Sequence, residues 1–213
     1  MKKIVVVNAG PRKGWNTDLL LKEAAKGAEA AGAEAVFFDL YKLPEFTGCV
    51  SCFGCKKEGN LGRCVCRDGL YDVLEAIRNA DGLIIGTPNY LGDATAAFRA
   101  LYERLIFQYI TYSREVPSYS GSNIPVLLVM TSNVAAEQYA AVGYDKVLER
   151  YRSNFERFIG PTETFVCGDT LQVSDYSKFN WSIFDPAHKQ KRREEVFPLE
   201  KQQVFDRARK MAE

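Results

Sequence analysis

The stretch that decides the fold is KIVVVNAGPRKGWNT, residues 3–17. Lys3 to Asn8 is a continuous run of mostly β-branched residues, which is typical of a strand buried on both faces of a parallel sheet. The loop AGPRKGW follows, and Asn16 and Thr17 are the expected N-cap residues of a helix that continues to about Ala31. A buried strand, a short loop and a helix form the first unit of an α/β protein.

Strand and helix continue to alternate along the chain. Further strands are predicted at Ala33–Asp39, Leu83–Thr87, Ile124–Thr131 and Thr162–Val166, and further helices at Leu70–Ala80, Ala94–Phe107, Val142–Ile159 and Leu199–Ala212. This pattern predicts an open, doubly wound parallel sheet of five strands with helices on both faces. We expect one domain over residues 1–213, with a cysteine-rich loop (45–69) after the second strand and a charged C-terminal tail (185–213).

The composition narrows the class of protein. At 213 residues and 46% hydrophobic, the chain is long enough to bury one substantial core. Its 28 basic and 27 acidic residues leave no basic surplus for a nucleic-acid surface. No apolar stretch approaches the roughly 20 residues that span a bilayer, and the apolar part of MKKIVVVNAG is too short for a signal peptide. We therefore expect a cytoplasmic protein without nucleic-acid or membrane partners.

Ligands of doubly wound sheets bind beyond the carboxyl ends of the strands. Three loops are expected at that edge: Ala9–Asn16, Pro88–Asp93 and the residues from Ser132 onward. In the second loop a planar ring could lie against the backbone, and its candidate residues are Pro88, Asn89, Tyr90, Leu91, Gly92 and Asp93. Proline, asparagine and glycine are also ordinary turn residues, so this loop indicates a ring-binding site only in combination with the Ala9–Asn16 loop.

The first loop has the chemistry of a phosphate cradle. Gly10 permits close backbone approach, Pro11 fixes the turn and Arg12 brings a permanent charge. Asn16 and Thr17 place donors at a helix N-terminus, where backbone N–H groups and the helix dipole favour an anion. The loop is neither a Walker A nor a GxGxxG sequence. An ordinary capped turn with solvated basic side chains is the alternative interpretation.

Five of the six cysteines fall in CVSCFGCKKEGNLGRCVC, residues 49–66. Cysteine used as a small hydrophobe would be scattered along the strands. This segment is rich in Gly and Lys and offers little apolar burial, so a shared cross-link is indicated: an iron–sulfur cluster, a zinc ion or disulfides. Structural disulfides are disfavoured in the cytosol, where clustered cysteines more often bind metal.

The cysteine spacing favours an iron–sulfur cluster. Cys49, Cys52 and Cys55 form a C-x2-C-x2-C run of the kind that ligates three corners of a [4Fe–4S] cubane, with a distant cysteine for the fourth iron. Structural zinc more often uses two separated C-x2-C knuckles, whereas one residue lies between Cys64 and Cys66. Zinc and free thiols remain as alternatives. Cys167, outside this run, is expected to be buried and inert.

Four motifs carry a family resemblance: NAGPRKGWNT, GCVSCFGC, RCVCRDGL and ADGLIIGTPNYLGDATAAFRALYERL, in this order between Lys2 and about Leu105. On these motifs the chain resembles the iron–sulfur flavoproteins of the NADPH-dependent FMN reductase group, which have the flavodoxin fold. The resemblance implies FMN in the cradle, with Arg12, Asn16 and Thr17 near its phosphate and the 88–93 loop along the isoalloxazine.

The chain departs from the family at two places. Gly10 precedes Pro11 where the family usually has serine, which removes a hydroxyl donor to the phosphate. Eight residues separate Cys55 from Cys64, a wider spacing than the family's usual one. Cys64 keeps the family's position four residues before an aspartate, here Asp68. The resemblance therefore implies the ligand set Cys49, Cys52, Cys55 and Cys64, with Cys66 as a neighbour.

The function implied is an FMN-dependent oxidoreductase that passes electrons between a [4Fe–4S] cluster and FMN. The implied redox partner is ferredoxin or NAD(P)H, and the implied assembly is a homodimer or homotetramer with the cluster of one subunit near the flavin of another. One alternative is an NAD(P)H-dependent FMN or quinone reductase without a cluster. The other is a zinc-stapled binding module without redox turnover. In the tail, His188 and the basic run Lys189–Arg193 are interpreted as a solvated helix face.

Overall fold

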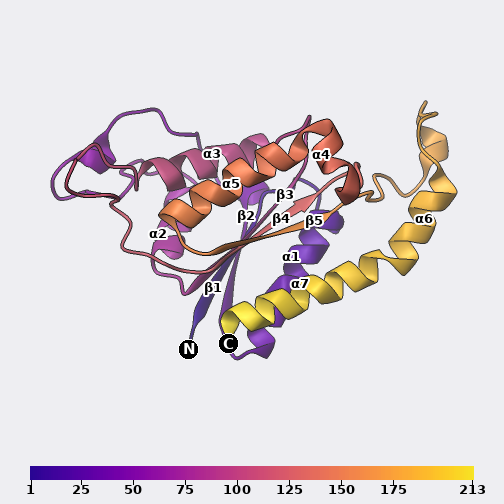
Figure 1. Cartoon of the computed structure of the whole chain (residues 1–213), viewed down its shortest axis with the longest axis horizontal. Coiled ribbons are helices and arrows are strands. Elements are labelled where there is room, and N and C mark those ends of the chain that lie inside the picture. Colours follow the sequence, from indigo (N-terminus) through magenta and orange to yellow (C-terminus); the bar gives the residue numbers. More distant parts are fainter.

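A computed structural model describes residues 1–213. Its strands are β1 (Lys3–Asn8), β2 (Glu34–Asp39), β3 (Gly82–Pro88), β4 (Val126–Thr131) and β5 (Thr162–Cys167). All pair in parallel in the order β2-β1-β3-β4-β5 (Figure 1). This is the flavodoxin-like order, with the change of direction between β1 and β3. The predicted five-stranded, doubly wound parallel sheet is confirmed.

Seven helices surround the sheet (Figure 1). They are α1 (Asn16–Ala30), α2 (Tyr71–Arg78), α3 (Ala96–Phe107), α4 (Tyr139–Val142), α5 (Tyr144–Phe158), α6 (Pro186–Glu195) and α7 (Phe197–Ala212). One face of the sheet carries α2, α3 and α5, and the other carries α1 and α7. None of these helices has the length and hydrophobicity that a bilayer crossing requires.

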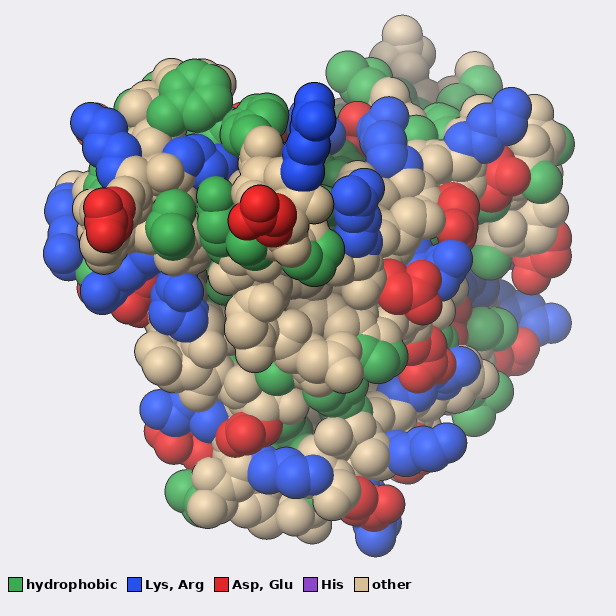
Figure 2. All heavy atoms as spheres, turned by 60° about the vertical axis from the view of Figure 1, so that its left-hand side comes forward, with side chains coloured by type: hydrophobic (Ala, Val, Ile, Leu, Met, Phe, Trp, Pro, Cys, Tyr) green, Lys and Arg blue, Asp and Glu red, His purple; other side chains and the backbone are tan.

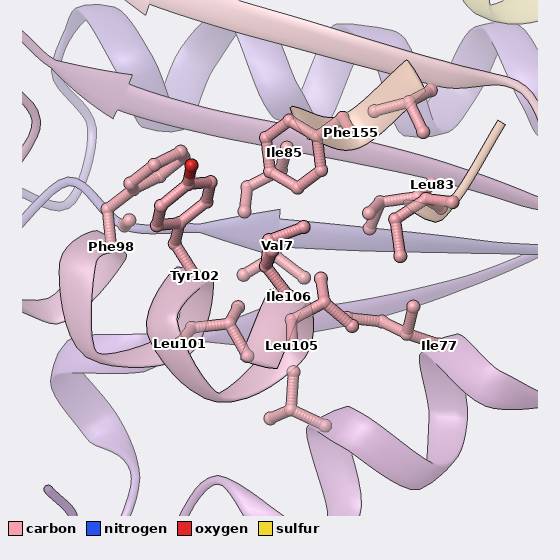
Figure 3. Close-up of a cluster of buried hydrophobic side chains, with 14 of the residues drawn as sticks. Val7, Ile77, Leu83, Ile85, Phe98, Leu101, Tyr102, Leu105, Ile106 and Phe155 are labelled. Atoms are coloured by element: carbon pink, nitrogen blue, oxygen red, sulfur yellow. The ribbon is translucent and has the colours of Figure 1, made fainter. Parts of the chain in front are cut away.

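The larger core lies between the sheet and the helices α2, α3 and α5. Phe98, Leu101 and Leu105 of α3 point from one side of this core, and Val7 and Ile85 of the central strands point from the other (Figure 3). All five side chains are fully buried. The apolar face of α3 therefore fixes this helix against the sheet, and α3 in turn carries side chains toward the cysteine segment.

The C-terminal helix α7 packs along α1 on the opposite face. A Cβ atom at Gly27 would lie 2.2 Å from the carbonyl oxygen of Phe205, so only glycine allows the two helices to approach this closely. Val204, Ala208 and Ala212 are buried in the same contact. The end of the charged tail thus contributes to the core, and the predicted helix over 199–212 is confirmed with two further residues at its start.

One sequence prediction is confirmed and another needs correction. The helix expected over 142–159 is α5, and Gly143, with a φ of 77°, separates it from the short helix α4. The basic run 189–193 does lie on a helix, α6, but its face is not simply solvated. Lys189 is 5% exposed and bonds to Asp169, and Arg192 pairs with Glu200 at 2.6 Å. Long-range partners explain this burial, and the local sequence does not reveal them.

Candidate functional site

A cavity of about 560 Å³ lies at the carboxyl edge of the sheet, between the loops that follow β1, β3, β4 and β5. We call it the edge cavity. Its lining residues are Gly10, Pro11, Arg12, Trp15, Asn16, Thr17, Pro88, Asn89, Tyr90, Thr131, Ser132, Asn133, Thr170, Leu171 and Gln172. None of them is acidic. The fold thus brings together nine of the twelve residues predicted for a cofactor.

The start of α1 leaves backbone donors free at this cavity. Trp15 is the N-cap residue and makes no side-chain bond to the helix, so the capping role predicted for Asn16 and Thr17 is wrong. Asn16 instead donates from Nδ2 to the Leu171 carbonyl at 2.9 Å, and the Thr17 hydroxyl bonds to that of Thr131 at 2.7 Å. Because no side chain occupies the first-turn N–H groups, the helix end retains the chemistry of an anion site.

Arg12 extends over the Trp15 ring, with its guanidinium carbon 3.8 Å from the ring centroid. It has no acidic partner within 4.0 Å. Stacking on an aromatic face holds an arginine in place while its N–H groups stay available. The loop after β1 therefore offers an unpaired positive charge beside the free amides of α1.

Gly10 sits too close to its neighbours for a side chain. A Cβ atom there would lie 3.1 Å from Asn8 Oδ1 and 3.1 Å from Thr17 Cβ. The Gly10 N–H donates to Asn8 Oδ1 at 2.9 Å, and the buried Nδ2 of Asn8 has no partner. The loop at Gly10 thus leaves little room for a side chain and one buried donor unused behind it.

Gly10→Ser is expected to lower the free energy of unfolding by about 1 kcal/mol, because the added atoms must displace Asn8 or Thr17. Urea unfolding followed by circular dichroism measures this difference. Gly121→Ser is the matched control, since nothing lies within 4 Å of a Cβ atom at Gly121. A Gly10→Ser protein as stable as the Gly121→Ser protein would contradict the steric explanation.

The loop after β3 enters the edge cavity only with its first half. Tyr90 and Asp93 exchange two backbone hydrogen bonds, so the chain reverses at Leu91 and Gly92, with φ values of 55° and 82°. Leu91 is fully exposed, and neither tip residue lines the cavity. The Asp93 carboxylate accepts from the Tyr151 hydroxyl and therefore anchors the loop to α5. Leu91, Gly92 and Asp93 are the three predicted cofactor residues that lie outside the cavity.

Residues after the fourth and fifth strands complete the edge cavity. Ser132 lines it, as the sequence predicts, and its backbone N–H bonds to the Cys167 carbonyl at 2.9 Å. Thr170, Leu171 and Gln172 also line the cavity but were not predicted from the sequence. Their position directly after the fifth predicted strand could have indicated them, because all parallel strands end at the same edge of the sheet.

All five clustered cysteines line a second cavity of about 380 Å³, which we call the cysteine pocket. The other lining residues are Gly48, Val50, Phe53, Val65, Arg104, Phe107 and Gln108. No disulfide is formed. As the side chains stand, no three His, Cys, Asp or Glu groups converge as a ligand set for a metal ion. The five thiols thus line one pocket, but they do not converge on a common point within it.

The backbone around Cys52 is strained. Ser51 and Phe53 have φ values of 52° and 57°, in the left-handed region that non-glycine residues rarely occupy. Each such residue costs about 1–2 kcal/mol. Strain of this kind persists where surrounding structure enforces it, and it concentrates at functional sites. The turn that brings Cys49, Cys52 and Cys55 together is therefore a costly conformation.

Buried donors of α3 lie behind the cysteines. Arg104 Nε and Gln108 Nε2 are buried and lack any hydrogen-bond partner. Burial alone would lower the pKa of Arg104, but its contacts with Asp68 and the Cys64 thiol raise it. Lys56, next to Cys55, donates to the Ile110 carbonyl at 2.6 Å and adds a second charge near the pocket. Unused donors and positive charge are what an anionic group in this pocket requires.

The surroundings of Cys64 and Cys66 differ. The Cys64 N–H donates to Gln108 Oε1 at 3.0 Å, which fixes its backbone at the pocket wall. The Cys66 Sγ lies 3.8 Å from a carboxylate oxygen of Asp68. Burial, with this carboxylate, raises the pKa of the Cys66 thiol. A thiolate at Cys66 would therefore lie beside the negative charge of Asp68.

The two cavities lie at opposite ends of α3 and share no lining residue. Thr95, the N-cap of α3, donates to the Ala9 carbonyl beside the edge cavity, whereas Arg104 lines the cysteine pocket. At 1.5 Å per residue, this stretch of helix is about 14 Å long. The two sites are therefore separate within one chain.

The amino-acid sequence is similar to that of known proteins over about half of the chain. An iron–sulfur flavoprotein of Methanocaldococcus jannaschii is 33% identical over 102 residues, which cover 48% of this chain and 51% of the relative. An iron–sulfur flavoprotein of Archaeoglobus fulgidus is 35% identical over 104 residues, 48% of each chain. The matched segment thus spans about half the length of these relatives.

The whole fold also has solved counterparts. An NAD(P)H:quinone oxidoreductase from Methanothermobacter marburgensis superposes with a TM-score of 0.70 over 100% of this chain and 98% of that one, at 11% identity. At this identity the likeness concerns the fold alone. Residues 2–143 match the family described as NADPH-dependent FMN reductase. Because this match covers most of the chain, the protein belongs to the NADPH-dependent FMN reductase family.

Proposed function

We propose that the protein is a flavin-dependent oxidoreductase that holds FMN in the edge cavity and a [4Fe–4S] cluster in the cysteine pocket. The observation that carries the proposal is the set of buried donors, Arg104 Nε and Gln108 Nε2, left without partners where five thiols line one space. When bound, FMN supplies one- and two-electron chemistry and a cluster supplies one-electron transfer.

The edge cavity has the donors that a flavin phosphate needs. The phosphate would take the free N–H groups at the start of α1, with Arg12 as the nearby charge. The unpartnered Nδ2 of buried Asn8 adds a donor behind Gly10. The ring would lie along Pro88, Asn89 and Tyr90, where side chains and backbone exclude water from one of its faces.

The cysteine pocket would hold the cluster through Cys49, Cys52, Cys55 and Cys64. Burial raises the pKa of the Cys55 thiol, so its thiolate form requires a positively charged metal. Lys56 brings a positive charge, and Arg104, which is paired with Asp68, brings an unused N–H donor toward the negative charge of four thiolates and sulfide. Small side-chain rotations are required for the thiols to converge, because they do not form a ligand set as they stand.

Separation of the two sites along α3 favours electron transfer across a subunit contact. The side that carries the cysteine segment comes forward in Figure 2, where hydrophobic side chains gather among lysines and arginines. Exposed apolar side chains in this region are Val50, Phe53, Leu61, Val65 and Tyr112. A homodimer or homotetramer in which this surface of one subunit packs against the edge-cavity side of another would bring the cysteine pocket of the first toward the edge cavity of the second.

Two observations favour a second candidate, an NAD(P)H-dependent FMN or quinone reductase without a cluster. The thiols do not converge, and the family that the chain matches is described by NADPH-dependent FMN reduction alone. In that case the edge cavity would carry the activity, and the cysteines would remain thiols.

Anaerobic reduction separates the two candidates. We expect NADPH or reduced ferredoxin to bleach the flavin bands and, with them, a broad absorbance that a cluster adds beneath. Bleaching of flavin bands alone, with no iron signal in electron paramagnetic resonance after dithionite, would support the reductase without a cluster. Protein that releases no flavin on denaturation would contradict both.

A further inference from the structure

Helix α6 reaches the edge cavity from outside the part of the chain that matches the family, which ends at residue 143. Arg193 Nη1 donates to Asn16 Oδ1 at 2.8 Å, and Lys189 Nζ donates to Asn133 Oδ1 at 2.9 Å. Asn16 and Asn133 both line the cavity. Two basic residues, one turn apart on α6, therefore each hold a cavity residue in place.

These two basic residues differ in their charge balance. The Lys189 ammonium pairs with the Asp169 carboxylate. Arg193 has no carboxylate within 4.0 Å, although its neighbour Arg192 pairs with Glu200. Its guanidinium instead lies 4.0 Å from the centroid of the Phe197 ring. Burial lowers the pKa of Arg193, as expected for a charge that has no counterion inside the protein.

Arg193 acts on the cavity through Asn16, whose side-chain oxygen and nitrogen are both hydrogen-bonded. Asn16 accepts from Arg193 with Oδ1 and donates with Nδ2 to the Leu171 carbonyl. This amide ties together the start of α1, the loop after β5 and α6. The backbone N–H of Asn16 has no partner at the start of α1. The positive charge of Arg193 and the positive end of the α1 dipole thus lie together. The one acidic residue in the first turn of α1, Asp18, is paired with Lys22, and no acidic residue lines the cavity.

We infer that Arg193 is a positioning residue for the phosphate end of the edge cavity, and that through it the C-terminal helix α6 makes the site selective for a phosphorylated flavin over riboflavin. The guanidinium fixes Asn16, and with it the first turn of α1, and adds an uncompensated positive charge that a phosphate dianion satisfies. Lys189 holds the opposite wall at Asn133 and is neutralised by Asp169, so it adds no selectivity. This inference rests on the proposed function, because it takes FMN to be the ligand of the edge cavity.

Flavin affinity of the full-length protein, freed of flavin, tests the inference. Dissociation constants for FMN and riboflavin are measured by quenching of flavin fluorescence in wild type, Arg193→Met, Arg193→Lys and Lys191→Met. Lys191→Met is the matched control: it removes one positive charge from the same helix, but the Lys191 side chain is 71% exposed and has only a 4.0 Å contact with Glu195.

We expect Arg193→Met to weaken the binding of FMN about tenfold, or about 1.4 kcal/mol, and the binding of riboflavin less than about twofold. Arg193→Lys is expected to keep part of the preference for FMN, and Lys191→Met to keep all of it. The ratio of the two affinities is the readout, because partial misfolding lowers both equally. An equal loss for FMN and riboflavin, or no loss for FMN, would overturn the inference while leaving the proposed function intact. A wild-type protein that binds no FMN would overturn the proposed function itself.

Discussion

Replacing Cys55 with serine is expected to reduce the iron content of the protein from about four atoms per chain to below about one. Cys55 is buried in the cysteine pocket, and a buried hydroxyl does not ionise to replace a thiolate. FMN content is expected to stay unchanged, because the edge cavity lies at the other end of α3. Iron and flavin analyses of protein purified without oxygen measure both quantities.

Cys167→Ser is the control for this result. Cys167 is as buried as Cys55 but lies on β5, with its thiol 3.1 Å from Glu200, and it belongs to neither cavity. Its replacement is expected to leave iron unchanged. Cys64→Ser is expected to behave like Cys55→Ser, and Cys66→Ser like the control. Full iron retention in Cys55→Ser would contradict the assignment of the cluster to this pocket.

Arg104→Met is expected to lower the free energy of unfolding by about 3 kcal/mol, because it leaves the Asp68 carboxylate partly buried without its partner. The Arg104 side chain is 1% exposed, lies 2.7 Å from Asp68 Oδ2 and also donates to the Cys66 carbonyl. Urea unfolding gives the difference. Arg209→Met, which removes a surface pair with Glu213, is expected to change stability little.

The ion pair between Arg104 and Asp68 also makes the free energy of unfolding depend on pH. Burial would raise the pKa of Asp68, but hydrogen bonds from Arg104, Thr47 and Leu70 outweigh it and lower the pKa below its usual value. A depressed folded-state pKa adds stability that is present above the unfolded pKa of about 3.9 and is lost as the pH falls through the folded value. The difference between wild type and Arg104→Met is therefore expected to shrink below pH 4. A constant difference from pH 6 to pH 3 would show that packing, rather than the ion pair, accounts for the loss.

The sheet could be predicted because its strands are local signals. Residues 4–7 of the first strand are all β-branched, and such a run is typical of a strand that is buried on both faces. Helix ends were less predictable. The predicted helix over 142–159 begins two residues later in the structure, at Tyr144, because Gly143 in the left-handed region separates α5 from the short helix α4.

Residues of the two sites were predictable where they follow a predicted strand or share a motif. Cysteine spacing identified which thiols share one pocket, since five of them line it. It did not indicate the buried donors, because Arg104 and Gln108 lie on a helix about 40 residues later in the chain. Lys189 and Arg193 were interpreted as solvated for the same reason. Arg193 meets Asn16 across 177 positions of sequence, and no local pattern reports such a partner.

Iron, acid-labile sulfide, zinc and FMN should be quantified in one sample of protein purified without oxygen. About four irons, four sulfides and one FMN per chain, with no zinc, are the contents expected of a flavoprotein with a [4Fe–4S] cluster. Stoichiometric zinc without iron or flavin would contradict that assignment and leave a metal-stapled binding module on the same fold.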